Sequence, residues 1–131
     1  MSISRCSPVQ DGGPEMITLA ECSQLSATER AILERFATQA KEVLHDNLVS
    51  LILFGSRARG EARPDSDVDL LLVVKDLNRA SQTLDDLDDV VLDLLFEYGL
   101  LLAMIPVEAA QFAQQERLLY RLASREGVRI L

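Results

Sequence analysis

Two aspartates, Asp67 and Asp69, stand one residue apart at the start of an apolar run, and the pair Gly55-Ser56 ends the preceding apolar run. Side chains alternate across a β-strand, so both carboxylates are expected on the same face. Two such carboxylates can share one or two Mg²⁺ ions, which prefer oxygen ligands and commonly bind substrate phosphates as well. The pair therefore predicts metal-assisted phosphoryl chemistry, in which bound metals stabilise the attacking and leaving oxygens.

The Gly-Ser pair suits the phosphates of the same substrate. Glycine lets the backbone approach a phosphate without a Cβ in the way, and the Ser56 hydroxyl adds a donor. A short helix from Ser56 through Arg59 would also direct its N-terminal N–H groups at an anion. Arg57 and Arg59 are candidates for added positive charge near a polyphosphate, although solvated surface positions explain two arginines here equally well.

Each piece alone has an ordinary explanation, because Gly-Ser often makes a turn and Asp-x-Asp often starts a strand. The joint arrangement is more specific: a strand over 48–54, Gly-Ser, ten further residues, Asp-x-Asp, and a second strand over 67–74. The continuous apolar end of the second strand predicts burial on both of its faces.

The remaining elements must position these residues. Ser26 and Glu29 have capping-box spacing, which predicts a helix from there to about His45. A second helix is expected over 80–98 and should end at Gly99. A strand over 100–107 follows, in which Pro106 indicates an edge position. One helix or two short ones over 108–124 and a final strand over 127–131 complete a small mixed sheet with helices on one side, which defines an α+β fold.

Length and composition set further limits. A chain of 131 residues, 48% of them apolar, fits one domain, taken as residues 25–131, behind a mobile extension over 1–24. No segment resembles a membrane span or a secretory signal, so a cytoplasmic location is expected. Two reduced thiols are accordingly expected at Cys6 and Cys22. The net charge of −8 argues against general nucleic-acid binding.

The segments 54–60 and 64–70, which read FGSRARG and PDSDVDL, resemble the signature of the minimal nucleotidyltransferases in the DNA polymerase β superfamily. The resemblance implies the nucleotidyltransferase fold and transfer of a nucleoside monophosphate, usually AMP from ATP, to a hydroxyl with release of pyrophosphate. It also implies that Gly55 and Ser56 hold the triphosphate and that Asp67 and Asp69 bind Mg²⁺.

The resemblance further implies a third carboxylate on the next strand, which helps to bind the catalytic metal and takes the proton of the attacking hydroxyl. The strand over 100–107 reads LLLAMIPV, and no acid lies within it. Glu97 precedes it and Glu108 follows it, both distant from the usual position. This departure puts efficient turnover in question and leaves nucleotide binding intact.

Acidic residues crowd the helix over 80–98, where Asp85, Asp89, Asp93 and Glu97 recur every four residues. A solvated face is the ordinary interpretation, and a docking surface for a basic partner is the alternative. The family resemblance implies a partner: a small helical protein of the HEPN type, a toxin that the transferase, as antitoxin, modifies with AMP.

Three functions compete at this point. The first is an Mg²⁺-dependent transferase acting on a partner protein, which the Gly-Ser and Asp-x-Asp motifs favour. The second is a catalytically weak nucleotide-binding antitoxin that acts by complex formation, which the missing acid favours. The third, transfer to a small molecule, is disfavoured because so short a chain has little left to build an acceptor pocket.

Overall fold

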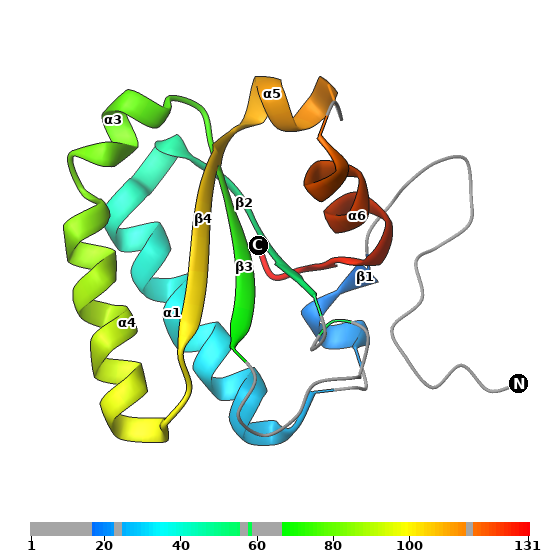
Figure 1. Ribbon diagram of the computed structural model, residues 1–131. Helices are drawn as coiled ribbons and strands as arrows, with labels where there is room; N and C mark the ends of the chain where they lie inside the picture. The colour runs from blue at the N-terminus through cyan, green and yellow to red at the C-terminus, as the bar shows by residue number, and fades with distance from the viewer. Residues whose placement is uncertain (1–16, 23–24, 56–57, 59–66, 115–116) are drawn as a thin grey trace, which may run out of the picture.

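The computed structural model describes residues 17–22, 25–55, 58, 67–114 and 117–131. Within these ranges a five-stranded mixed sheet has the order β1-β5-β2-β3-β4, with helices packed on it (Figure 1). The strands are β1 (Ile17–Thr18), β2 (Leu48–Phe54), β3 (Val68–Val74), β4 (Leu102–Glu108) and β5 (Val128–Arg129). The α-helices are α1 (Ala27–Leu44), α3 (Leu77–Ser81), α4 (Leu84–Tyr98), α5 (Ala109–Gln114) and α6 (Leu118–Glu126), and the 3₁₀ helices are η1 (Leu19–Glu21) and η2 (His45–Asn47).

The predicted capping box starts α1. Glu29 N donates to Ser26 Oγ over 3.0 Å, and Ser26 N donates to Glu29 Oε1 over 2.8 Å. These bonds satisfy N–H groups that an uncapped first turn leaves without partners. The helix ends at His45, whose φ of 50° reverses the chain. The helix predicted from the sequence is confirmed at both ends.

The centre of the sheet is formed by β2, β3 and β4. β2 and β3 pair antiparallel, with Phe54 opposite Asp69. β3 and β4 pair in parallel, with Asp69 beside Ala103. β4 is an edge strand, as Pro106 predicted, because proline cannot donate to a neighbouring strand. The α+β class with a mixed sheet is therefore confirmed.

Helices cover both faces of the sheet, which corrects the expectation that they lie on one side. One apolar core includes Leu53 and Leu70 and packs under α1 and α4. The other includes Ile52, Leu71 and the α6 residue Tyr120. Figure 1 shows the sheet nearly edge-on between these two layers. β2 and β3 are apolar on both faces, so each face requires a cover.

The helix expected over 80–98 is in fact two helices, α3 and α4, with a turn at residues 82–83 between them. Its predicted end is confirmed, because Gly99 adopts the left-handed conformation with φ of 72° and its N–H donates to Leu95 O over 2.8 Å. The segment over 108–124 forms two short helices, α5 and α6. No helix among the described residues has the length and apolar character needed to cross a bilayer.

Residues 17–22 belong to the folded domain, although the sequence placed them in the extension. β1 pairs in parallel with β5, and Arg30 Nη1 donates to Leu19 O over 2.6 Å. Cys22 is fully buried and disulfide-bonded, so the expectation of a reduced thiol there is wrong. The only other cysteine of the sequence, Cys6, lies outside the described residues. Local spacing did not reveal these contacts because their partners are distant in sequence.

Candidate active site

A tight turn at Gly55 ends β2 beside Asp69. Gly55 has a φ of +82°, a conformation that residues with a side chain rarely adopt. A Cβ built on Gly55 would overlap Asp69 Oδ2 and would lie 3.3 Å from Asp69 Cγ. The glycine is therefore required twice, for its backbone conformation and for the space that the Asp69 carboxylate occupies.

Asp67 and Asp69 lie on the α6 face of the sheet. The β3 residues Leu70 and Leu72 belong to the core under α1, whereas Leu71 belongs to the core under α6. Alternation along the strand places Asp69, and Asp67 two residues before it, on the α6 side. Asp67 is exposed and Asp69 is half-buried. The two carboxylates expected on one face are thus at the end of the sheet where β2 stops and β3 begins.

No acid lies beside Asp69 on the neighbouring strand. The parallel register of β3 and β4 pairs Asp69 with Ala103, and residues paired in this way present their side chains on the same face. Ala103 therefore stands where a third carboxylate would be closest. Among the described residues, His, Cys, Asp and Glu side chains form no cluster of three that could hold a metal.

The two acids nearest to Ala103 in the sequence, Glu97 and Glu108, are bound to other groups. Glu108 Oε2 accepts from Leu77 N over 3.1 Å, five strand residues beyond Ala103. At roughly 3.3 Å per residue this is about 16 Å from the position beside Asp69. Glu97 Oε1 accepts from Arg35 Nη1 over 2.8 Å, on the α1 and α4 side of the sheet. Neither acid takes the place of the third carboxylate.

Three predicted site residues, Ser56, Arg57 and Arg59, lie outside the described residues. The residue between them, Ala58, is buried in the core under α1. The nucleotide-binding roles of the three residues remain predictions.

An arginine row on α6 was missed by the sequence reasoning. Arg117, Arg121 and Arg125 recur every four residues and are exposed on the helix that covers the Asp67 and Asp69 face. The Arg117 guanidinium lies 5.9 Å from the centre of the Tyr120 ring. The four-residue spacing was the available signal. The row is a basic feature in a chain that is acidic overall.

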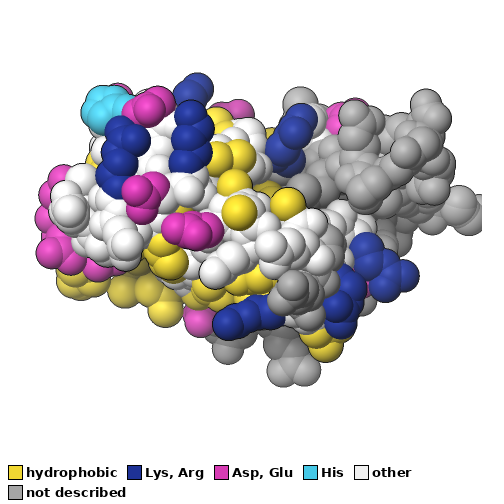
Figure 2. All heavy atoms as spheres, turned by 90° about the horizontal axis from the view of Figure 1, so that it is seen from above, with side chains coloured by type: hydrophobic (Ala, Val, Ile, Leu, Met, Phe, Trp, Pro, Cys, Tyr) yellow, Lys and Arg dark blue, Asp and Glu magenta, His cyan; other side chains and the backbone are white. Residues whose placement is uncertain are grey.

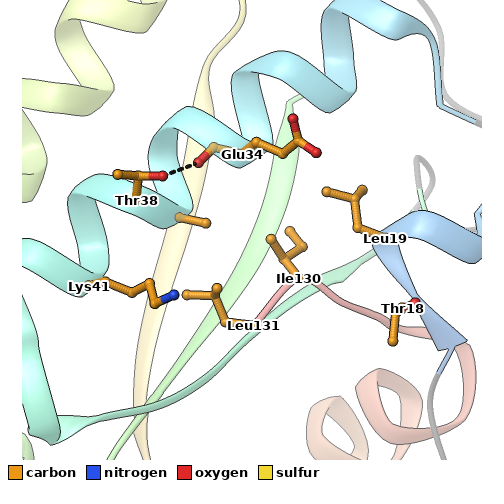
Figure 3. Close-up of a pocket in the computed structure, with 8 residues that line it drawn as sticks. Thr18, Leu19, Glu34, Thr38, Lys41, Ile130 and Leu131 are labelled. Atoms are coloured by element: carbon orange, nitrogen blue, oxygen red, sulfur yellow. Dashed lines mark hydrogen bonds between the residues drawn. The ribbon is translucent and has the colours of Figure 1, made fainter.

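A cavity of about 380 Å³ lies between α1 and the C-terminal strand segment (Figure 3). Lys41 and Glu34 border it, and Leu131 and Ile130 line its apolar side. Thr38 Oγ1 donates to the backbone oxygen of Glu34 over 3.0 Å, so this hydroxyl is already engaged. The cavity contains neither Asp67 nor Asp69, because both point to the other side of the sheet. It is not part of the candidate active site.

The two carboxylates fit a hard divalent cation. Asp67 and Asp69 supply oxygen ligands on one face, and the absence of a side chain at Gly55 makes room for the Asp69 carboxylate beside the turn. Mg²⁺ typically takes one or two protein carboxylates and completes its shell with phosphate oxygens and water. This donor set can hold a metal that is shared with a nucleotide.

The mixed sheet, the glycine turn and the paired aspartates are the features expected of a nucleotidyltransferase. Residues 32–122, more than half of the chain, match the family described as "Nucleotidyltransferase domain". The chain belongs to this family. The match includes β2, the Gly55 turn, β3 and β4, and so contains the whole candidate site.

Two proteins of Methanocaldococcus jannaschii are similar to this chain. "Putative protein adenylyltransferase MJ1305" is 44% identical over 78 residues, which cover 59% of this chain and 53% of that protein. "Putative protein adenylyltransferase MJ0141" is 44% identical over 46 residues, which cover 35% of this chain and 46% of that protein. The chain thus spans about half the length of the curated relatives it matches.

Proposed function

We propose that this chain transfers AMP from ATP to a hydroxyl group of a partner protein with the aid of Mg²⁺. The acceptor oxygen bonds to the α-phosphorus, the bond to pyrophosphate breaks, and the hydroxyl proton is released. The observation that carries the proposal is the close approach of Gly55 to the Asp69 carboxylate, with Asp67 on the same face. The names of the two relatives, both "Putative protein adenylyltransferase", support the acceptor class.

Asp67 and Asp69 would hold the metal, which when bound neutralises phosphate charge and orients the α-phosphate. The residues of the chain position the reacting groups. The Gly55 turn brings backbone close to the phosphates, and the register of β2 and β3 fixes that turn against Asp69. Restricting the reacting groups in this way is a large part of phosphoryl-transfer catalysis.

The finer proposal concerns the biological setting. The acceptor would be a small helical toxin of the HEPN type, and this chain would be its antitoxin in the cytoplasm. The acidic α4 supports a basic partner.

A second candidate function is neutralisation by complex formation with weak or no transfer. Ala103 favours it, because the position beside Asp69 on β4 has no carboxylate to accept the hydroxyl proton. Under this alternative the nucleotide site binds ATP and its occupancy does not lead to AMP transfer.

One experiment separates the two functions. The protein is incubated with Mg²⁺, α-labelled ATP and the protein encoded beside it, and label on that protein is measured along with its toxicity in cells. The enzyme proposal expects label with the wild-type chain, and loss of both label and neutralisation with Asp67→Ala/Asp69→Ala. Absence of label together with full neutralisation by the double variant would establish the alternative.

A further inference from the structure

The surface of α4 that faces away from the sheet carries two exposed apolar residues. Phe96 is 83% exposed and Leu92 is 48% exposed. They are four residues apart and therefore adjacent on the helix surface. Buried residues of α4, such as Leu87 and Leu94, lie on the opposite side of the helix. Leu92 and Phe96 thus contribute nothing to the core, although burying such side chains in an interface is favourable.

Acidic side chains border this apolar pair. Asp85, Asp89 and Asp93 are all exposed and follow the same side of α4. Figure 2 shows acidic side chains gathered at the left edge, where Figure 1 draws α4, with hydrophobic side chains adjoining them. Repulsion between acids four residues apart destabilises a helix. We call Leu92 and Phe96 with these three aspartates the α4 outer face.

Glu97 is the last member of the acidic row expected from the sequence. It differs from the three aspartates because its carboxylate already has a partner within the chain. Its carboxylate is bound to Arg35 of α1, and this bond lowers the pKa of Glu97 below its usual value of 4.5. The pair ties α4 to α1. The exposed carboxylates of Asp85, Asp89 and Asp93 therefore form the acidic part of this surface, around the apolar pair.

The α4 outer face leads to the candidate active site. α4 ends at Tyr98, and β4 starts four residues later beside the start of β3. Val68 N, next to Asp67, donates to Leu101 O over 2.9 Å. Tyr98 and Leu101, at the two ends of the connection from α4 to β4, are themselves 41% and 39% exposed. A protein held on α4 can reach the site around this end of the sheet (Figure 1).

We propose that the α4 outer face docks the acceptor protein, which presents apolar side chains bordered by Lys and Arg. This inference rests on the proposed function for the identity of its occupant. Specific interfaces usually have an apolar centre and a polar border. The charges on the two borders are usually of opposite sign, so the acidic border of α4 fits a basic one. Docking at this face leaves the nucleotide side of the sheet free and brings an acceptor hydroxyl to its edge.

A second copy of this chain fits the face less well. The outward side of α6 carries Arg121 and Arg125 beside exposed Leu118 and Leu122, which complements α4 in charge. However, α4 and α6 cover opposite faces of the sheet, so a contact between them is head-to-tail and extends into a filament unless a rotation closes it. Each added copy would also bring a net charge of −8, and the repulsion between these charges disfavours self-association.

The test measures binding and transfer separately. Calorimetry with the purified small helical protein encoded beside this chain compares the wild type with Phe96→Ala and Leu92→Ala/Phe96→Ala. Alanine favours helix at these exposed positions, so α4 is retained. We expect binding at least about 30-fold weaker for Phe96→Ala, as for a central interface residue. Leu118→Ala, which removes a 61% exposed leucine on the other side of the sheet, should bind like the wild type.

The charged border of the α4 outer face is tested with one variant and one control variant. Asp89→Asn/Asp93→Asn should weaken binding about 3- to 10-fold at low salt and less at high salt, since the interaction is screened. Glu34→Gln/Glu42→Gln, which removes the charge of two exposed acids on α1, should leave binding unchanged. Equal effects of the α4 and α1 changes would mean that only the total charge matters, which contradicts the proposal.

The outcomes distinguish this inference from the proposed function. A complex that forms without AMP transfer, and that Phe96→Ala weakens, supports the docking face and contradicts the transferase. Transfer that Phe96→Ala leaves unchanged contradicts the docking face alone. Failure of the wild-type chain to bind this protein overturns the inference. So does sedimentation equilibrium if it shows a self-assembly of the wild type that Phe96→Ala dissociates, since the face would then belong to a second copy.

Discussion

The carboxylate of Asp69 fills the space in which a side chain at Gly55 would begin. The two residues come from different strands, and the antiparallel register that places Phe54 opposite Asp69 brings them together. The Gly55 backbone, which we propose approaches a phosphate, and the Asp69 carboxylate, which we propose holds a metal, therefore lie in contact. Several experimental expectations depend on this arrangement and on the groups around it.

Gly55→Ala is expected to disturb the site more than the fold. The new Cβ both strains a backbone with φ of +82° and displaces the Asp69 carboxylate. Misplacement by about 1 Å can reduce turnover about 100-fold, whereas the left-handed backbone costs about 1–2 kcal/mol. Labelled-ATP transfer and thermal unfolding measure the two effects.

Gly99→Ala is the matched control for this glycine. Gly99 has a similar φ of +72°, but a Cβ there meets nothing within 4 Å. We expect a similar backbone cost and unchanged transfer from labelled ATP. Equal loss of transfer in the two variants would show that backbone strain, and not the contact with Asp69, is responsible.

Ala103→Asp is expected to raise the rate of transfer. Ala103 lies in register beside Asp69 on the same face, so the change places a third carboxylate where a proton acceptor is absent. General-base assistance typically contributes 10²- to 10⁴-fold, and an unoptimised group should give on the order of 10-fold or more. Ala103→Asn has nearly the same shape without the charge. A rate that rises equally in both variants would exclude the base.

The ion pair of Arg35 and Glu97 predicts a local titration. The hydrogen bond from Arg35 lowers the pKa of Glu97 in the folded protein, so the pair stabilises the fold above the unfolded value of 4.5 and loses this effect as the pH falls through the lowered value. NMR titration should find the Glu97 pKa below 4.5 in the wild type, and closer to it in Arg35→Gln.

Asp46 is the internal reference for that titration. Its pKa is lowered by Arg79, whose Nη2 lies 2.7 Å from Asp46 Oδ1, and Arg79 is unaffected by a change at Arg35. The Asp46 titration should therefore be the same in the wild type and in Arg35→Gln. A shift of both carboxyl groups would indicate a general change of charge and not the loss of one pair.

Asn47→Ala should destabilise the whole domain. Asn47 is 1% exposed, and its side chain donates to Asp76 O over 3.0 Å and accepts from Asp76 N over 2.9 Å. The change leaves both backbone groups of Asp76 without these partners, which should lower the free energy of unfolding by about 2–4 kcal/mol. Denaturant unfolding provides the measurement. Asn78→Ala, an exposed asparagine nearby, should change it by less than about 0.5 kcal/mol.

Signals in the sequence predicted an element correctly where residues within that element alone determine its structure. The Ser26 capping box defined α1, and the left-handed Gly99 defined the end of α4. The apolar run over 48–54 has the same bounds as β2. The break between α3 and α4 was missed, because residues 77–98 have no Gly or Pro to mark it.

The sequence predicted which residues belong to the candidate site better than it predicted how they are arranged in space. Alternation along one strand is enough to place Asp67 and Asp69 on a common face. The exclusion of Glu97 and Glu108 required tertiary contacts, since one is bound to Arg35 and the other to the N–H of Leu77. The role of the described residue Gly55 also became clear only when its distance to Asp69 was known.

The sequence by itself determined the strands, the paired carboxylates and the lack of an acid before Glu108, because strand period and residue type are local properties. Only the tertiary structure decided that Ala103 stands beside Asp69, that helices cover both faces of the sheet, and that residues 17–22 join its edge. These features depend on register and on contacts between segments far apart in the chain. The energy that selects them comes from burying both faces of the sheet at once, which no single segment encodes.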